Sequence, residues 1–410
     1  MAHSIKTVAA PDGSVRTRNL AARAVAAGTM AILFAVLVLW TALPAHAANH
    51  TSSTGGKQPG GTGLQSPWPW IKKELVDQVL TGPGNARNSE GDFIRLKNGD
   101  LLHVYTRFIG DSSWDNADAC IASRRSADNG RTWTQENKTE VVKGEGLNVM
   151  SVSCLRLKSG ALALFYLTKV SKDDCRPFMR VSLDEGRTWS EPKECLKEKG
   201  YYLLCNGRAV MLEKSRPGRI VLPLSWVDKE SRQRLSCLIS DDDGETWQHK
   251  GEVPNPKNDV HQEPVVCELG DGRLAMFTRT TQNCQCFAFS SDSGETWTEP
   301  APSPLDSPVS PCMVKRIPGR NELVAVWNPM LIFSECEPIR VAMDIAALSP
   351  DAGTILVRKT MEFPCDNYRD WQYPYIYFLN EREFLVGYFN WDNGTNVYLL
   401  DIADLLEEER

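Results

Sequence analysis

Carboxylate, arginine and tyrosine side chains stand beside short apolar runs at several points of this 410-residue sequence. In the segment from His261 to Arg279, Glu263 precedes one apolar run, an Asp-Gly pair follows it, and the arginine ends the next run. A tyrosine-rich run begins at Gln372, with Tyr373 as its second residue. A guanidinium group binds a carboxylate through two parallel hydrogen bonds, and a hydroxyl activated by a neighbouring base is a nucleophile. These residue types suit a reaction on an acidic substrate.

Each of these residues also has a purely structural interpretation. A glutamate at the start of a strand is often solvated, an arginine is often a surface charge, and aromatic residues of a strand usually belong to the core. The functional interpretation therefore requires a fold that brings distant segments together.

One eight-residue pattern, Ser-x-Asp-x-Gly-x-Thr-Trp, indicates what that fold is. Four copies occur, at Ser126–Trp133, Ser182–Trp189, Ser240–Trp247 and Ser290–Trp297, and a decayed fifth copy without the tryptophan starts at Ser349. The aspartates of successive copies are 56, 58, 50 and 59 residues apart, which is the length of a four-stranded propeller blade.

The pattern has the chemistry of a turn. Serine and aspartate side chains accept hydrogen bonds from nearby backbone amides, glycine adopts positive φ, and Thr-Trp favours a following strand. A calcium loop of the EF-hand type also spaces acidic residues around a glycine, but it requires a glutamate about twelve residues in, which no copy has. We interpret the copies as Asp-box turns and expect their tryptophans to be buried at equivalent positions.

Six short turns that separate apolar runs give the number of blades. They are Asn98-Gly99, Ser159-Gly160, Pro217-Gly218, Asp271-Gly272, Pro318-Gly319 and Asn380-Glu381-Arg382. Each is typical of a hairpin between the two inner strands of a blade. The sequence thus predicts an all-β protein in which residues 68–410 form one six-bladed propeller of four-stranded antiparallel blades.

The first 47 residues are expected to lie outside this fold. Basic residues, including Arg16 and Arg18, precede an apolar run over 24–43, and Ala45-His46-Ala47 fits a signal-peptide cleavage site. The alternative is an uncleaved anchor, because about twenty apolar residues can span a bilayer. Either way, we expect a secreted, periplasmic or cell-surface protein, in contact with a membrane only if the segment stays uncleaved. Residues 48–67, rich in Gly, Ser and Thr, are expected to be a flexible leader.

Composition limits the partners. Twelve cysteines, all after residue 119, suit an oxidising compartment, although some could be buried thiols and their pairing is not determined by the sequence. Cys284 and Cys286 form one close pair without a second pair at metal-ligand spacing, so a zinc site is not expected. A net charge of −6, with no basic run after the leader, argues against a nucleic-acid partner. No protein partner is evident.

From Asn85 onwards the chain resembles the sialidase (neuraminidase) superfamily of Asp-box six-bladed propellers. The resemblance implies that Glu263 polarises a nucleophile, that Tyr373 is this nucleophile, and that Arg279 binds the substrate carboxylate. It further implies an acid/base aspartate eleven residues before the first box, which is Asp115, with Asp111 and Asp118 as nearby alternatives.

Two further arginines are implied by the resemblance as parts of a carboxylate-binding set. Arg340 follows an Asn-Pro pair ahead of the fifth box, one residue farther from it than is usual in the family. Arg87 stands two positions early and lacks the following Ile-Pro, so it is the weakest match. Arg208, in the sequence C-N-G-R-A-V, is another candidate for the pocket wall.

The resemblance implies an exo-glycosidase that removes terminal sialic acid, or a related acidic sugar, from glycoconjugates. A neutral tyrosine can approach an anomeric carbon that carries a carboxylate, whereas a carboxylate nucleophile would be repelled. This chemistry needs no metal or organic cofactor. Two alternatives remain open: a propeller glycosidase acting on another sugar, and a non-catalytic carbohydrate-binding propeller, which would have no need of the Tyr373–Glu263 pair.

Overall fold

The computed structural model describes residues 66–144, 146–331, 340–363, 370–390 and 394–407, which all belong to one compact unit. The predicted signal segment and nearly all of the predicted leader lie outside these residues, and so do Cys336 and Cys365. The described part is almost entirely β-structure, with one short helix, α2 (Ile402–Leu406). No helix within it is long and apolar enough to cross a membrane.

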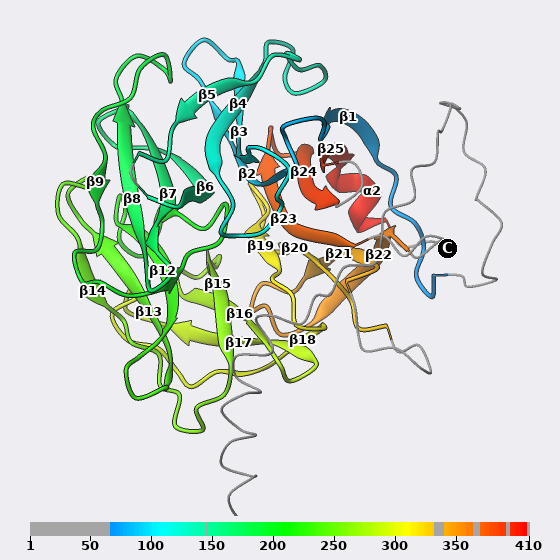
Figure 1. Ribbon diagram of the computed structural model, residues 1–410. Helices are drawn as coiled ribbons and strands as arrows, with labels where there is room; N and C mark the ends of the chain where they lie inside the picture. The colour runs from blue at the N-terminus through cyan, green and yellow to red at the C-terminus, as the bar shows by residue number, and fades with distance from the viewer. Residues whose placement is uncertain (1–65, 145, 332–339, 364–369, 391–393, 408–410) are drawn as a thin grey trace, which may run out of the picture. The chain divides into compact units, whose positions relative to one another are not determined.

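The strands form six antiparallel sheets around one axis, as the sequence predicts (Figure 1). Blade 1 contains β2 (Arg87–Arg95), β3 (Leu101–Phe108), β4 (Ala119–Ser126) and β5 (Lys138–Val141). Blade 2 contains β6 (Asn148–Arg156), β7 (Leu162–Ser171), β8 (Asp174–Ser182) and β9 (Lys193–Glu194). Blade 3 contains β10 (Tyr202–Leu203), β11 (Val210–Met211), β12 (Ile220–Val227), β13 (Gln233–Ser240) and β14 (Gln248–Lys250).

The second half of the ring follows the same plan. Blade 4 contains β15 (His261–Glu268), β16 (Leu274–Thr280), β17 (Cys284–Ser290) and β18 (Ala301–Asp306). Blade 5 contains β19 (Met313–Arg316), β20 (Leu323–Trp327), β21 (Met343–Leu348) and β22 (Ile355–Glu362). Blade 6 contains β23 (Trp371–Phe378), β24 (Glu383–Asn390) and β25 (Gly394–Asp401), and β1 (Glu74–Val79) is its outermost strand.

Strand β1 closes the ring. It pairs antiparallel with β25, so the N-terminal strand of the propeller belongs to the same sheet as the last three strands. Lys73, just before β1, holds this blade against blade 5, because its ammonium group donates to the carbonyl of Met361 at 2.7 Å and also bonds to Glu362. The segment that precedes blade 1 thus completes blade 6, which ties the two ends of the ring together.

The Asp boxes are turns between the third and fourth strands of their blades. In all four full copies the serine hydroxyl donates to the aspartate at 2.8 Å. The glycine N–H donates to the same serine at 2.8–2.9 Å, and the threonine N–H donates to the aspartate at 2.8–2.9 Å. The glycines have φ between 76° and 90°. The sequence-based interpretation of this pattern as a turn is therefore confirmed.

The expectation that all four box tryptophans are buried is only half correct. Trp133 and Trp297 are 7% exposed, whereas Trp189 and Trp247 are half-buried. The turns occupy equivalent places, since the box glycines of blades 2, 3 and 4 face a side chain of the preceding blade. The Trp189 indole packs only partly against the core between blades 1 and 2, and it donates to the Glu140 carboxylate at 2.8 Å.

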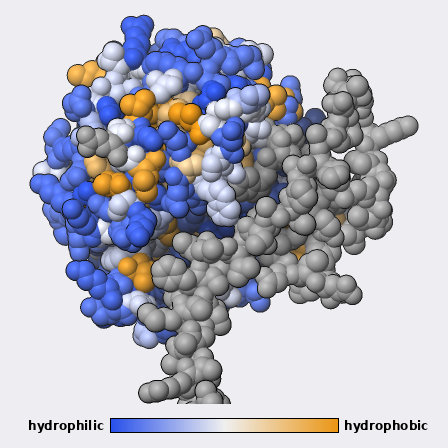
Figure 2. All heavy atoms as spheres, viewed as in Figure 1, coloured by the Kyte–Doolittle hydropathy of each residue, from blue (hydrophilic) through white to orange (hydrophobic). Residues whose placement is uncertain are grey.

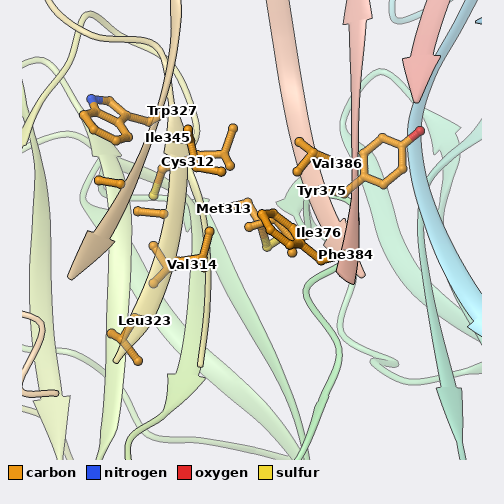
Figure 3. Close-up of a cluster of buried hydrophobic side chains, with 14 of the residues drawn as sticks. Cys312, Met313, Val314, Leu323, Trp327, Ile345, Tyr375, Ile376, Phe384 and Val386 are labelled. Atoms are coloured by element: carbon orange, nitrogen blue, oxygen red, sulfur yellow. The ribbon is translucent and has the colours of Figure 1, made fainter. Parts of the chain in front are cut away.

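The largest hydrophobic cluster joins blades 4, 5 and 6 and extends to Phe93 and Leu101 of blade 1; part of it is drawn in Figure 3. Tyr375 belongs to it, but its hydroxyl points away from the neighbouring Ile376 and forms a 2.7 Å hydrogen bond with Nε2 of His103 in blade 1. Gly91 and Gly387 leave the space that this ring occupies. The outer face in view in Figure 2 is mainly hydrophilic, with apolar side chains in small groups.

We expect Gly387→Ala to destabilise the propeller, because a Cβ atom there would lie 2.2 Å from Cζ of the fully buried Tyr375. Overpacking of this kind costs about 1–3 kcal/mol of unfolding free energy. Gly82→Ala is the matched control, since a Cβ atom added at Gly82 would have no other atom within 4 Å. Urea unfolding of both variants tests the prediction, which fails if the two lose equal stability.

Candidate active site

The innermost strands of four blades share a bulge at the same end of the axis. Each bulge contains a non-glycine residue in the left-handed region: Glu90 (φ 54°), Ser151 (φ 61°), Glu263 (φ 47°) and Tyr373 (φ 53°). Such backbone is strained, and a bulge of this kind within a strand redirects a side chain, often next to an active site. All four residues line one pocket. The bulges therefore turn their side chains towards the axis, where an ordinary strand would alternate between its two faces.

The pocket brings together the three predicted catalytic residues, Tyr373, Glu263 and Asp115, although Asp115 and Tyr373 are far apart in the sequence. Of the two alternatives for the acid, Asp111 is exposed and Asp118 forms an ion pair with Lys143 at 3.0 Å; neither lines the pocket. The remaining wall comes mainly from blades 2 and 3 and includes Cys175, Tyr201 and Cys205.

Glu263 and Arg279 form an ion pair across the β15–β16 hairpin. Nη1 of Arg279 lies 2.8 Å from Oε2 of Glu263, and both side chains are largely buried. The Nε of Arg279 has no hydrogen-bond partner among the described residues. Burial, followed by the charges of Glu263, Asp115 and Glu90, raises the pKa of Tyr373 well above its usual value, against the opposing charge of Arg340. The Tyr373 hydroxyl is therefore neutral at physiological pH.

Arg87 links the loop that carries Asp115 to Glu90 of the pocket. Its Nη1 donates to Oδ1 of Asp115 at 2.7 Å, and its Nη2 lies 3.4 Å from Oε2 of Glu90. The guanidinium carbon is also 5.9 Å from the ring centre of Tyr373. Partial desolvation acts to raise the pKa of Asp115, but the charge and hydrogen bond of Arg87 outweigh it, so the pKa of Asp115 lies below its usual value.

Two polar side chains of blade 2 anchor the loop that carries Asp115. The amide of Asn148 donates to the Asp115 carbonyl at 2.6 Å, and the buried Lys169 ammonium donates to the same carbonyl at 3.0 Å. The Asp115 carboxyl group itself is 59% exposed, so it stands at the mouth of the pocket. Neither anchoring residue was identified from the sequence.

The other two predicted arginines have different positions. Arg340 stands near Tyr373, with its guanidinium carbon 5.8 Å from the ring centre, and donates to Oε1 of Gln372 and to the Val309 carbonyl. Arg208 is fully buried and does not line the pocket. Its Nη1 approaches the sulfur of Met313 at 3.8 Å, so this guanidinium lies inside the axial core.

Glu90 is a pocket residue that the sequence analysis missed. It is 2% exposed, and burial, reinforced by Asp115 and Glu263 and opposed by Arg87, raises its pKa to about 7. A signal was present: Glu90 precedes Gly99 by nine residues, just as Glu263 precedes Gly272. The two glutamates occupy equivalent bulges of blades 1 and 4.

We expect the Glu90 carboxyl group to make the fold less stable as the pH rises. Its folded pKa of about 7 exceeds the ordinary value of 4.5, so between these values the folded state binds more protons than the unfolded state, and stability falls with rising pH. Glu90→Gln should therefore gain stability relative to the wild type between pH 4.5 and 7, with no further gain above. Urea unfolding across this range is the measurement; a difference independent of pH would contradict the assignment.

Comparisons with known proteins give matches over part of the chain. The family model described as BNR repeat-like domain matches residues 115–383. An anhydrosialidase of Macrobdella decora is 32% identical over 129 residues, which are 30% of this chain and 16% of that protein. A sialidase of Paraclostridium sordellii is 27% identical over 229 residues, 49% of this chain and 55% of that protein. The matched region thus spans about half of the clostridial relative.

Among solved structures, the intramolecular trans-sialidase of Ruminococcus gnavus has a TM-score of 0.65 at 14% identity, covering 83% of this chain and 99% of that one. At this identity the likeness concerns the fold. The fold, a six-bladed propeller with Asp-box turns, is shared with that solved structure. The chain belongs to the BNR repeat-like domain family.

Proposed function

We propose that this protein is an exported retaining glycosidase of sialidase type, which releases terminal sialic acid or a related acidic sugar from glycoconjugates. The observation that carries the proposal is the convergence of Tyr373, Glu263 and Asp115 in one axial pocket beside Arg87 and Arg279. Similarity to sialidases in part of the sequence supports it.

In this proposal the arginines hold the carboxylate that a sialic acid carries on its anomeric carbon. Arg279, whose Nη1 lies 2.8 Å from Glu263 of the pocket, is one of these arginines. That charge would repel a carboxylate nucleophile, whereas the neutral Tyr373 hydroxyl can approach. Glu263, in the same pocket, then takes the phenolic proton as the tyrosine oxygen bonds to the anomeric carbon.

Asp115 is proposed to protonate the leaving glycosidic oxygen and later to deprotonate the attacking water, which gives net retention. In the ligand-free protein its pKa is lowered by Arg87, so Asp115 is ionised. A substrate carboxylate that binds Arg87 would compete with Asp115 for this guanidinium and add a negative charge nearby. Both effects raise the pKa of Asp115 and favour the protonated form that an acid requires.

Export is proposed on sequence grounds alone, from the basic and apolar pattern of residues 16–47. The ten cysteines in the described part are free thiols, and nine of them are buried. A fold that does not depend on disulfides among these ten is compatible with either redox compartment, so the thiols neither support nor oppose export.

A specific observation favours a second candidate, a glycosidase of neutral sugars. Arg87 already faces two carboxyl groups, Asp115 and Glu90, and Arg279 faces Glu263. Three acidic groups thus accompany the three arginines of the predicted set, and a pocket with balanced charges binds an extra carboxylate less strongly than a cationic one.

One assay separates these candidates. Purified protein is incubated with 3′- and 6′-sialyllactose and with a panel of neutral aryl glycosides, and proton NMR follows the anomer that forms first. The proposal predicts release of sialic acid as the α-anomer before mutarotation. Cleavage of neutral glycosides alone would replace it with the second candidate, and binding of sialyllactose without turnover would indicate a carbohydrate-binding propeller.

A further inference from the structure

A second pocket lies at the opposite end of the propeller axis. Strands β2, β6 and β23 enter the candidate active site at Glu90, Ser151 and Tyr373, near their first residues, and line the second pocket with their later residues. The two pockets share no lining residue. Arg95 lies five positions after Glu90 on β2, which is roughly 15 Å along the strand.

The second pocket is basic, although the whole chain carries a net charge of −6. Its lining includes Arg95, Lys97, Arg156 and Lys315, against a single carboxylate, Asp92. A second carboxylate, Glu185, binds Arg156 at 2.6 and 2.8 Å and lies 3.5 Å from Nζ of Lys97. One negative charge thus compensates two positive charges only in part.

The other two cations have no carboxylate of the described residues in contact. Arg95 donates only to neutral oxygens, namely the carbonyls of Gly99 and Leu379 and the amide of Asn129. Lys315 makes neither a hydrogen bond nor an ion pair with any described residue; the carboxylate whose charge acts on it is Asp92. The charges of these two cations are therefore not neutralised by a contacting carboxylate of the described residues.

Asp92 offsets only part of this excess. It is 4% exposed, and its two oxygens accept the backbone N–H groups of Phe93 and Cys154 at 2.9 and 2.8 Å. The charge of the fully buried Arg208 also acts on Asp92 from within the axis. Nε and Nη2 of Arg208 have no partner among the described residues. Five cations thus face two carboxylates around this end of the axis.

Most other buried or half-buried arginines of this protein are matched with carboxylates. Arg219 contacts Asp241 and Glu295, Arg176 contacts Asp174 and Glu194, and Arg358 contacts Asp344 and Asp306. Cations gathered without counter-charges repel one another and lose solvation. An unmatched group at a concave site is therefore suited to an anionic ligand that supplies the missing charge.

We propose that this axial pocket, on the face opposite the candidate active site, binds a phosphate or sulfate group. The excess of positive charge fits a dianion better than a carboxylate, and the separated positions of Arg95, Lys97 and Lys315 suit an acceptor with oxygens in several directions. The Tyr377 side chain, with Leu155 and Ala209, gives the pocket an apolar wall against which the organic part of a phosphate or sulfate ester can pack.

The test is calorimetric titration of the full chain with sodium sulfate, sodium phosphate, N-acetylglucosamine 6-sulfate and N-acetylglucosamine 6-phosphate, with sodium chloride holding ionic strength constant. We expect saturable binding of one equivalent of at least one dianion, with Kd of a few millimolar or less, and no saturation by acetate. Tighter binding of a sugar ester than of the inorganic ion identifies an ester as the ligand; equal binding identifies the free ion.

Variants locate the site. Lys315→Met should weaken binding at least tenfold, and Lys97→Gln, at a more exposed position, about threefold. Lys214→Gln, which removes an exposed lysine bonded to the Gly270 carbonyl, is the matched control and should bind normally. Tyr373→Phe should also bind normally. If Lys315→Met does not fold, the affinity of Lys97→Gln for the dianion tests the proposal by itself. Absence of saturable binding, or binding unchanged by both pocket variants, overturns the proposal.

Discussion

Tyr373→Phe is expected to lower kcat on sialyllactose on the order of 10³-fold or more while leaving the affinity for a sialoside nearly unchanged. The hydroxyl is the proposed nucleophile, and its loss removes an interaction made in the transition state rather than in the bound substrate. The ring itself stays, so its contacts with the guanidinium groups of Arg87 and Arg340 persist. Steady-state kinetics, with isothermal titration of sialyllactose to the inactive variant, measure both quantities.

Tyr377→Phe is the matched control. It also removes a tyrosine hydroxyl from β23, but Tyr377 lines the opposite pocket. We therefore expect kcat to change by less than about twofold. Full turnover of sialyllactose by Tyr373→Phe would show that Tyr373 is not the nucleophile. Equal losses in the two variants would show that the effect comes from disturbance of β23 rather than from chemistry.

Arg279→Ala is expected to weaken binding of acidic glycans by about 2–5 kcal/mol, the range found when one partner of a buried charge pair is removed. The guanidinium is the proposed carboxylate donor, and it also holds Glu263 at 2.8 Å. Both losses should raise KM and lower kcat/KM. Loss of the contact with Glu263 also leaves this side chain, which is 11% exposed, without its cation. We therefore expect a fall in thermal stability along with the kinetic effect.

Arg273→Ala provides the comparison for this variant. Arg273 stands in the same β15–β16 hairpin, where it pairs with Asp271 at the surface, and exposed pairs contribute little. Its kinetics should match the wild type. If Arg279→Ala instead loses stability but binds sialyllactose normally, the arginine serves only to position Glu263, and the second candidate function gains support because a neutral substrate requires no carboxylate donor.

The sequence by itself determined the number of blades and the position of their turns. Each Asp box closes its hydrogen bonds within eight residues, for example from Ser126 to Trp133, and each inner hairpin joins two neighbouring apolar runs. Such local patterns can be recognised in a sequence because all the residues that contact one another lie within one short segment. Glu263 and Arg279 could be named as candidates because one hairpin carries both residues, but their ion pair was not predicted.

The tertiary structure decided what depends on contacts between blades. The sequence did not indicate that β1 closes the ring, that Glu90 joins the pocket, or that Arg208 lies buried on the axis. The burial of Trp189 and Trp247 was wrongly predicted, because it depends on packing between neighbouring blades. Nor could spacing indicate the contact of Arg87 with Asp115, which requires a long loop to fold back over the pocket. Ion pairs and packing between blades form only when the ring closes, and they join residues that are far apart in the sequence, so no local pattern indicates them.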